Sequence, residues 1–262
     1  MGDYVPLKLY FDEQLAIRLS KLIREHYPSF SSNSFISSIT KQVEGKELKA
    51  RVEVIADELY VHLPNDYSEA ISVLLQIIGP ENESEEGMFT EGYFLMPVAK
   101  FIENYGLDDF DLSMGALKEI TKRHTSEYAI RPYLAKNIDL CLEYFNEWVT
   151  DTNSHVRRLV SEGTRPRLPW AKKMEPIHND PLNNLTLIQK LLHDTSPYVQ
   201  KSVANHINDL TKDYPSDVLL WIENIIERHQ EINTSLINHG LRTLIKKKDT
   251  TAEKIITTIN RV

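Results

Sequence analysis

Apolar residues recur every three or four positions along most of the chain, the spacing that places side chains on one face of an α-helix. In the first such segment Leu15, Leu19 and Leu22 share a face, with Ile23 beside them. No segment shows the sustained apolar–polar alternation of a strand. The pattern therefore predicts an all-α protein, whose next three helices are expected over residues 31–43, 47–62 and 67–78.

Composition is that of a soluble globular protein, with 41% hydrophobic and 26% charged residues. The stretch from Gly79 to Gly92 is acidic and polar, and it reads as an exposed loop. No apolar run is long enough to span a bilayer and no signal peptide is recognisable, so we expect a cytoplasmic protein. The single cysteine, Cys141, excludes an internal disulfide and a cysteine-based zinc site.

A short motif occurs twice. Residues 151–160 (DTNSHVRRLV) align with residues 194–203 (DTSPYVQKSV) at an offset of 43, and a fainter copy over residues 237–245 follows 38 residues later. This motif has Asp, then Ser or Pro, then Val, with a basic residue two positions after the Val. It is typical of the second helix in HEAT-like repeats, whose period is about 40–47 residues. Helix pairs of this kind stack, because no pair buries its apolar face alone. We therefore expect one α-solenoid over residues 1–262, with a concave DNA-binding face.

Charge divides the expected solenoid in two. The net charge is −8 overall, made up of −11 over residues 1–115 and +3 over residues 116–262. Because electrostatic fields act within about 10 Å at ordinary salt, the second portion is where a polyanion would bind. Acidic and basic faces that complement each other inside the fold would explain the same asymmetry. On this reading residues 1–115 form an acidic helical portion, and residues 116–262 carry the functional repeats.

The basic charge is concentrated in the segment SHVRRLVSEGTRPRLPW, residues 154–170. Six cations lie between Arg157 and Lys173, and they surround one acid, Glu162. Arginine suits phosphate because its planar fork engages two oxygens at once. The residues expected to contact DNA are Arg157, Arg158, Arg165, Arg167, Trp170, Lys172, Lys173 and Lys201. Of these, Arg157 is the one most open to a purely structural role, because its helix phase differs from that of Arg158.

The repeat places this segment at a helix end. Ser154 is expected to cap the helix and Gly163 to end it. Asn205 is the counterpart of Glu162 in the following repeat, and Asp209 lies one turn beyond, so Glu162 and Asp209 are expected to converge. Glu127, in the opening turn of a helix expected over residues 126–137, would present a third carboxylate from the preceding helix pair.

Three strings then resemble the AlkC-type DNA alkylation-repair glycosylases, relatives of the AlkD-type enzymes built from HEAT-like repeats. They are RHTSEYAIRPYL from Arg123, HVRRLVSEGTRPRLPWA from His155 and YVQKSVANHINDLTKDYP from Tyr198. Weaker similarity extends upstream, so the resemblance covers most of the chain. The segment Gly92–Pro97 departs from the family in being less aromatic, and the immunoglobulin-like extension of some relatives is not found.

The resemblance implies excision of cationic N3-methylated bases, chiefly 3-methyladenine and also 3-methylcytosine, from double-stranded DNA. It implies catalytic roles for Glu127, Glu162 and Asp209, and an aromatic position beside the lesion for Trp170. An N3-alkylated base is already a good leaving group, so carboxylates would stabilise the oxocarbenium-like sugar and activate water. We expect no cofactor and no metal, because the nine histidines lack metal-ligand spacing and no glycine-rich phosphate loop is present.

Each of these residues also has a plainer interpretation. Glu162 could be an i,i+4 surface partner of Arg158, and Asp209 a solvated acid beside Lys212. Glu127 could serve the helix dipole, and Trp170 could fill the core between repeats. The alternative function is a non-catalytic HEAT-repeat scaffold that binds DNA or protein. In either case we expect a monomer without membrane association.

Overall fold

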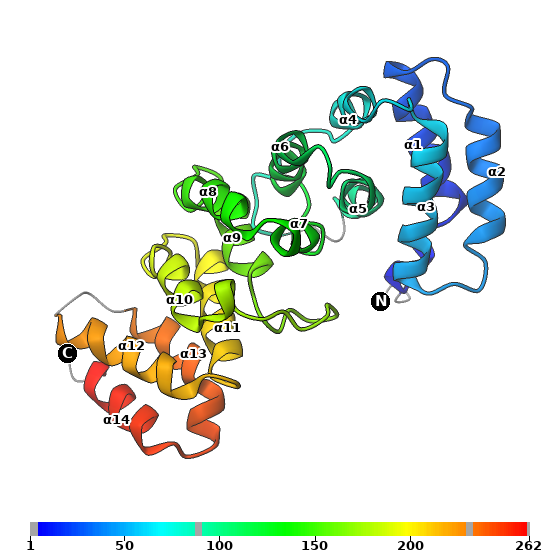
Figure 1. The fold of residues 1–262 in the computed structure, drawn as a ribbon. Helices are drawn as coiled ribbons and strands as arrows, with labels where there is room; N and C mark the ends of the chain where they lie inside the picture. The colour runs from blue at the N-terminus through cyan, green and yellow to red at the C-terminus, as the bar shows by residue number, and fades with distance from the viewer. Residues whose placement is uncertain (1–4, 87–90, 229–232, 261–262) are drawn as a thin grey trace. The chain divides into compact units, whose positions relative to one another are not determined.

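The computed structural model describes residues 5–86, 91–228 and 233–260, and all its regular secondary structure is helical. Fourteen α-helices and three short 3₁₀ helices occur within these ranges, and no strand does (Figure 1). The expected all-α fold is confirmed. The chain divides into two compact units, Met1–Lys136 and Asn137–Val262. The change of charge at residue 115 lies inside helix α6 (Phe110–Thr121) of the first unit, so it does not mark this division. A single solenoid over the whole chain stays a prediction.

The first unit is built from helices whose apolar faces pack together. Leu15, Leu19 and Ile23 are all buried, as their spacing predicted. The elements are η1 (Leu7–Tyr10), α1 (Glu13–His26), α2 (Ser32–Gln42), α3 (Leu48–His62), α4 (Tyr67–Gln76), η2 (Tyr93–Leu95), α5 (Met96–Tyr105), α6 (Phe110–Thr121) and α7 (Arg131–Lys136). Helices α2 to α4 match the predicted ranges within two residues. The described part of the expected 79–92 loop is free of helix and strand, and residues 87–90 lie outside the described residues.

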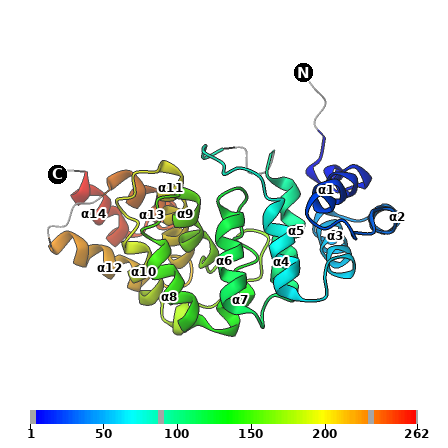
Figure 2. The ribbon, with the colours of Figure 1, turned by 90° about the horizontal axis from the view of Figure 1, so that it is seen from above.

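The second unit consists of helix pairs in two rows. Helix α11 packs between α9 and α13, while α10, α12 and α14 contact one another in a second row (Figures 1 and 2). This is the arrangement that the HEAT-like motif predicted. The elements are α8 (Ile138–Trp148), α9 (Ser154–Gly163), η3 (Ile177–Asn179), α10 (Pro181–Gln189), α11 (Pro197–Leu210), α12 (Pro215–Glu227), α13 (Thr234–Lys246) and α14 (Thr250–Ile259).

The repeat motif acts as a helix-start signal. Helices α9 and α11 begin 43 residues apart, and their caps Asn153 and Ser196 accept from backbone N–H groups of the first turn. Asn153, not Ser154, is therefore the cap of α9. The reason lies in the preceding Asp151, which accepts the Asn153 N–H at 2.8 Å and turns the chain into the extended conformation that a cap needs. In the helix of the third copy, the cap is Asn233, which accepts the Leu236 N–H.

Arg157 links two successive repeats. Its Nε and Nη2 donate to both oxygens of Asp194, at 2.6 and 2.8 Å, and its Nη1 donates to the carbonyls of Asp151 and Thr152. In the next repeat Gln200 stands in the place of Arg157 and donates to the Asp194 carbonyl at 2.6 Å. Arg157 thus holds the N-terminal ends of α9 and α11 in register. This is a structural role, which the sequence had suggested for Arg157 because its helix phase differs from that of Arg158.

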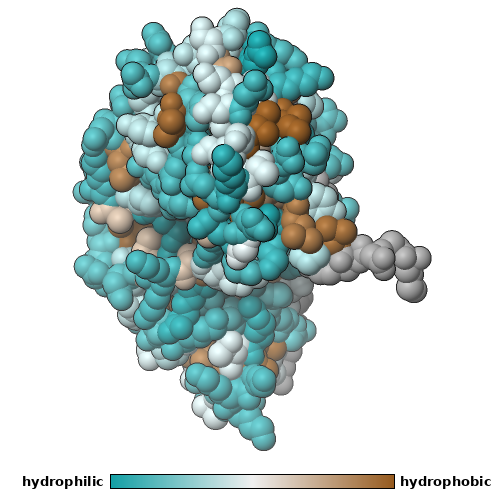
Figure 3. All heavy atoms as spheres, turned by 90° about the vertical axis from the view of Figure 1, so that its right-hand side faces the viewer, coloured by the Kyte–Doolittle hydropathy of each residue, from teal (hydrophilic) through white to brown (hydrophobic). Residues whose placement is uncertain are grey.

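The face of the molecule in Figure 3 is mostly hydrophilic, with separate hydrophobic residues scattered over it. Among the described helices, none combines the length and the apolar character needed to cross a bilayer.

Candidate active site

Glu162 lies in the last turn of α9, at the point where the chain leaves the helix. Thr164 caps the helix end, and its hydroxyl donates back to the Val160 carbonyl at 2.6 Å. Pro166 follows, and since proline has no N–H to donate, the helix cannot continue through it. The sequence SEGTRPRLPW therefore forces a turn immediately after Glu162, with Arg165 inside that turn.

A buried arginine joins two of the three predicted acids. Arg165 donates from Nη1 to Glu162 Oε1 at 2.6 Å and from Nε to Asp209 Oδ2 at 2.8 Å. Glu162, Arg165 and Asp209 are only 5%, 6% and 2% exposed. The structure therefore brings Glu162 of α9 and Asp209 of α11 together as the repeat predicted. It also places Arg165 between the two carboxylates, so the positive charge of Arg165 is paired with acids of the protein itself.

Two further groups hold the Glu162 carboxylate. Ser202 of α11 donates its hydroxyl to Oε2 at 2.6 Å, and Arg158 Nη2 lies 3.6 Å from Oε1. The expected i,i+4 pair of Arg158 and Glu162 is thus present, but it is buried on the Glu162 side and not a solvated surface bridge. Both carboxylate oxygens have a partner, so the side chain is fixed before any substrate arrives.

The protonation state of Glu162 follows from opposing effects. Burial by itself raises the pKa of a carboxyl group, because the charged form loses its water. The guanidinium groups of Arg158 and Arg165, together with the Ser202 hydroxyl, outweigh that effect and hold the pKa of Glu162 below its ordinary value. Glu162 is therefore an anion at neutral pH despite its burial.

One partner of Asp209 is the residue that the plainer interpretation expected, Lys212. Lys212 Nζ lies 3.0 Å from Oδ1, the i,i+3 pair that a surface helix acid would form. Asp209 is nevertheless buried, and its other oxygen accepts from Arg165. It is therefore part of the same charged cluster as Glu162 and not a solvated acid.

A neutral histidine supports this cluster from behind. His206 is fully buried; its Nδ1 donates to the Ser161 carbonyl at 3.0 Å, and its Nε2 accepts from Asn184 Nδ2 at 3.0 Å. Asn184 also donates to the Thr164 carbonyl at 3.1 Å. Burial, followed by the charge of nearby Arg165, lowers the pKa of His206 to about 4 against the pull of Asp209. The neutral ring therefore binds the Ser161 carbonyl directly, and it binds Asn184, which holds the Thr164 carbonyl on the other side of Glu162.

The remaining predicted DNA contacts differ in their surroundings. Arg167 forms a bidentate pair with Asp213 at 2.9 and 2.7 Å, and Lys173 lies 3.3 Å from the same carboxylate. The guanidinium of Arg158 lies over the ring of Tyr198, 4.7 Å from its centre. Three further predicted contacts lie on the exposed surface: Trp170, Lys172 and Lys201.

Trp170 stands out from its turn. Its side chain is 79% exposed, so it is not core filler between repeats. Its φ of 62° lies in the left-handed region, which is uncommon for a bulky residue. Such strain persists where the surrounding chain enforces it, and here the Met174 N–H donates to the Pro166 carbonyl across the turn at 3.0 Å. The loop therefore presents an indole ring to the outside.

Glu127 belongs to the first unit. It lies in a turn and not in a helix, because α7 begins only at Arg131. The reason is Pro132, whose ring would clash with the Tyr128 carbonyl if the helix extended further back. The side chain is buried, and the Thr125 hydroxyl donates to its Oε2 at 2.9 Å. That Glu127 lies close to Glu162 and Asp209 stays a prediction.

Sequence reasoning missed Ser202, His206 and Asn184. A usable signal was present: Ser202 and His206 interrupt the apolar face that Val199 and Val203 define on α11. A polar residue on a buried helix face must be hydrogen-bonded, so its position is itself evidence of a specific partner.

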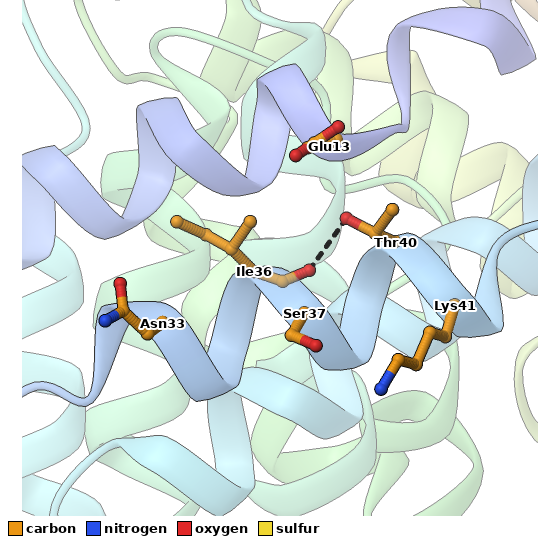
Figure 4. A pocket seen from close by; sticks show the side chains of 6 residues that line it. All are labelled: Glu13, Asn33, Ile36, Ser37, Thr40 and Lys41. Carbon is orange, nitrogen blue, oxygen red and sulfur yellow. Dashed lines mark hydrogen bonds between the residues drawn. The ribbon is translucent and has the colours of Figure 1, made fainter.

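Within the described ranges, no group of three or more histidine, cysteine or acidic side chains could hold a metal ion. A shallow pocket of the first unit lies between α1 and α2 and contains none of the predicted site residues (Figure 4). Its lining residues are Glu13, Asn33, Ile36, Ser37, Thr40 and Lys41.

Comparison with known proteins points to one family. Residues 114–244, which include all three predicted acids, match the family model described as DNA alkylation repair enzyme. The chain is 34% identical over 244 residues to the uncharacterized protein YhaZ of Bacillus subtilis (strain 168), and the match covers 93% of this chain and 66% of YhaZ. The chain thus spans slightly less than two thirds of that relative.

A solved structure has the same fold. The alkylpurine DNA glycosylase AlkC of Pseudomonas fluorescens, bound to DNA containing an abasic site analog, superposes with a TM-score of 0.84 at 32% sequence identity. The similarity covers 97% of this chain and 69% of the AlkC chain. The helical repeat fold expected from the sequence is thereby confirmed.

Proposed function

Because the chain belongs to the DNA alkylation repair enzyme family, we propose that it is a DNA glycosylase that excises cationic N-alkylated bases from duplex DNA. The substrates proposed are 3-methyladenine and 3-methylcytosine, and the reaction is monofunctional hydrolysis of the glycosidic bond. Similarity to a DNA-bound alkylpurine glycosylase supports DNA as the partner.

The chemistry of such substrates matches what Glu162 offers. An N3-alkylated base carries a positive charge, so it leaves without the help of a general acid. Positive charge then develops on the sugar, and a fixed carboxylate nearby stabilises it. A unit charge at about 4 Å contributes about 4 kcal/mol at an effective dielectric of about 20, against about 1 kcal/mol in bulk water. The difference corresponds to a rate factor on the order of 100.

The observation that carries the proposal is the ionised, buried carboxylate of Glu162 beside Asp209. A phosphate-binding surface normally avoids buried acids, since they repel the DNA backbone. Here two acids are held by Arg165, so their charge is kept in place and partly neutralised until a cation approaches. In the proposed reaction Glu162, Asp209 and Glu127 act on the sugar and the attacking water, and Arg165 positions the first two.

The exposed Trp170 and the basic residues of the same turn complete the proposal. The indole ring would contact DNA beside the lesion, and Lys172 would contact a backbone phosphate. Arg158, already close to Glu162, would lie where the strand passes the acids. In this proposal the cations and the aromatic ring bind DNA, and the acids take part in hydrolysis of the glycosidic bond.

A single substitution tests this model. Purified protein is incubated with DNA methylated to contain 3-methyladenine and 3-methylcytosine, and released bases are identified by mass spectrometry. Glu162→Gln keeps the shape but removes the charge, and we expect base release to fall about 100-fold or more while DNA affinity is nearly unchanged. The matched control is Glu227→Gln, an exposed acid at the end of α12. Release by Glu162→Gln that equals the control would reject the catalytic assignment.

The scaffold alternative is decided by the same assay. A non-catalytic repeat protein would bind DNA in a salt-dependent manner but release no base from methylated DNA. Absence of release by the unaltered protein, with DNA binding retained, would therefore favour the scaffold.

A further inference from the structure

Most cations that the sequence offered for DNA binding are neutralised within the second unit. Arg157 pairs with Asp194, Arg165 with Glu162 and Asp209, and both Arg167 and Lys173 with Asp213. A cation already paired with a carboxylate contributes little to phosphate binding, because the phosphate must displace the acid. The affinity of the unit for a polyanion must therefore come from other cations.

Candidate side chains for such binding lie on the neighbouring helices α11 and α13. Lys201 of α11 and the pair His239 and Arg242 of α13 are all exposed. Within the described part of the chain, none of the three forms an ion pair with a carboxylate. His239 and Arg242 both contact Asn205, which lies one helical turn before Asp209 on α11.

Arg242 and His239 are held in place by neutral acceptors. The Asn205 side-chain oxygen accepts from Arg242 Nη2 at 2.9 Å and from His239 Nε2 at 3.2 Å. Arg242 Nη1 donates to the His239 carbonyl at 2.6 Å. These hydrogen bonds fix the guanidinium without cancelling its charge. Two of its five N–H groups are used in this way, which leaves the planar fork able to engage a further anion.

The three groups also crowd one another electrostatically. Partial burial, then the charges of Arg242 and Lys201, lower the pKa of His239. The pKa of Arg242 is lowered as well, first by desolvation, with Asp209 opposing and Arg165 reinforcing the effect. An anion bound beside these side chains would offset the positive charges of Arg242 and Lys201 and favour the protonated form of His239.

We propose that Lys201, His239 and Arg242 form a binding site for one phosphodiester group of DNA, one repeat beyond Glu162. The proposal rests on the proposed function, since it assumes that the chain binds DNA. The ligand chemistry is that of a phosphate, which a DNA backbone or a free anion could supply. We favour the backbone, because Arg158 and Lys201 occupy equivalent positions in successive repeats and so continue one line of cations across α9 and α11.

Salt dependence of binding tests the proposal. The dissociation constant for an undamaged fluorescent duplex is measured by anisotropy between about 50 and 200 mM salt, for the unaltered protein, Arg242→Gln and Lys201→Gln. Each lost phosphate contact lowers the slope of log K against log salt by about 0.9. The matched control is Arg228→Gln, an exposed arginine at the end of α12 in the other row, which should leave the slope unchanged.

The design separates failure of the site from failure of the function. Lys201→Gln removes no hydrogen bond that supports the fold, and thermal unfolding shows whether Arg242→Gln still folds. If the unaltered protein binds DNA and releases methylated bases while both variants keep its slope, the site is rejected and the proposed function stands. If the unaltered protein neither binds DNA nor releases bases, the proposed function fails first.

A second titration distinguishes the source of the phosphate. Inorganic phosphate is added to each protein, and binding is followed by calorimetry. Weak or undetectable binding of inorganic phosphate, with the DNA slope lowered in the variants, supports a backbone contact. Tight binding of inorganic phosphate that Arg242→Gln abolishes, with the DNA slope unchanged, would overturn the assignment to DNA.

Discussion

Ser202 of α11 donates its hydroxyl hydrogen to Glu162 Oε2 of α9 at 2.6 Å, across the interface between two successive repeats. Both side chains are buried, so water cannot replace this bond. The hydroxyl favours the charged form of the carboxyl and fixes which way its second oxygen points. The packing of the repeats thereby sets the charge state of the residue on which the proposed reaction depends.

Removal of that hydroxyl should change the pH dependence of base release. In Ser202→Ala the pKa of Glu162 rises, because one of the groups that lower it is gone. We expect the acid limb of the rate–pH profile to move to higher pH, with release near neutral pH little changed. Ser161→Ala is the matched control, since the Ser161 hydroxyl lies 3.0 Å from Ser202 and not against the carboxylate. An acid limb that does not move in Ser202→Ala would contradict this role.

Arg165 should matter for stability more than any exposed arginine of the same turn. In Arg165→Gln two buried carboxylates lose their shared cation, which we expect to cost about 3–5 kcal/mol in the free energy of unfolding at pH 7. Arg167→Gln breaks only a partly exposed pair with Asp213 and should cost less than about 1 kcal/mol. Urea unfolding of the three proteins measures both differences.

The loss in Arg165→Gln should depend on pH with a defined sign. In the unaltered protein the pKa of Glu162 is lowered on folding, so this group adds stability above its ordinary pKa and loses it as the pH falls. Without Arg165 that contribution disappears at neutral pH, while acid protonates the two carboxylates and relieves their repulsion. The deficit of the variant should therefore shrink between pH 7 and pH 4. A deficit that stays constant over this range would show that packing, and not charge, explains the effect.

The sequence predicted the helices and the convergence of Glu162 with Asp209 because both depend on periodicity. A spacing of 43 residues places equivalent positions on adjacent helices wherever the repeat stacks, and the matching starts of α9 and α11 confirm it. Helix ends were predicted less well, since they depend on local bonds such as that of Asp151 to the Asn153 N–H, which made Asn153 and not Ser154 the cap.

The electrostatic partners were not predictable in the same way. Five of the six cations in the segment from Arg157 to Lys173 are paired with acids that lie 3 to 46 residues away, such as Asp194 and Asp213. The sequence shows which charged residues are present but not which of them pair. The cluster of arginines was therefore interpreted as a phosphate-binding surface, although several of these arginines pair with acids inside the protein. His239 and Arg242 of α13 were not among the predicted DNA contacts, because the third repeat copy is faint.

The buried His206 should make the protein less stable in acid. Its pKa in the folded state is about 4, below the ordinary value of 6.5, so the unfolded chain takes up a proton first as the pH falls. Acid therefore favours unfolding through this group, by about 1.4 kcal/mol per pH unit between pH 6.5 and 4 and roughly 3 kcal/mol in total. Above pH 6.5 the group contributes no pH dependence.

His206→Asn should flatten this part of the stability–pH curve. The variant is expected to be less stable at pH 7 by about 1–3 kcal/mol, because Asn184 loses its acceptor. Its free energy of unfolding should nevertheless fall less steeply than that of the unaltered protein between pH 6.5 and 4. The matched control is His239→Asn, an exposed histidine whose loss should leave the steep fall in place. Parallel curves for His206→Asn and the unaltered protein would show that another group causes the acid sensitivity.

The close packing of α13 against α11 depends on a glycine, Gly240. A Cβ atom added at Gly240 of α13 would lie 2.9 Å from Cγ2 and 3.1 Å from Cβ of Ile207 on α11. Gly240→Ala should therefore destabilise the protein by about 1–3 kcal/mol, although alanine is the better helix former. The matched control is Gly115→Ala in α6, where a Cβ meets nothing within 4 Å and should stabilise by up to about 1 kcal/mol. Differential scanning calorimetry of the two variants should show melting temperatures that move in opposite directions. In the double variant Gly240→Ala with Ile207→Ala, the shorter of the two contacts, to Cγ2, is removed, so the combined loss should be smaller than the sum of the single losses. Additive losses would mean that α11 and α13 separate without strain, and that the glycine is not what sets their distance.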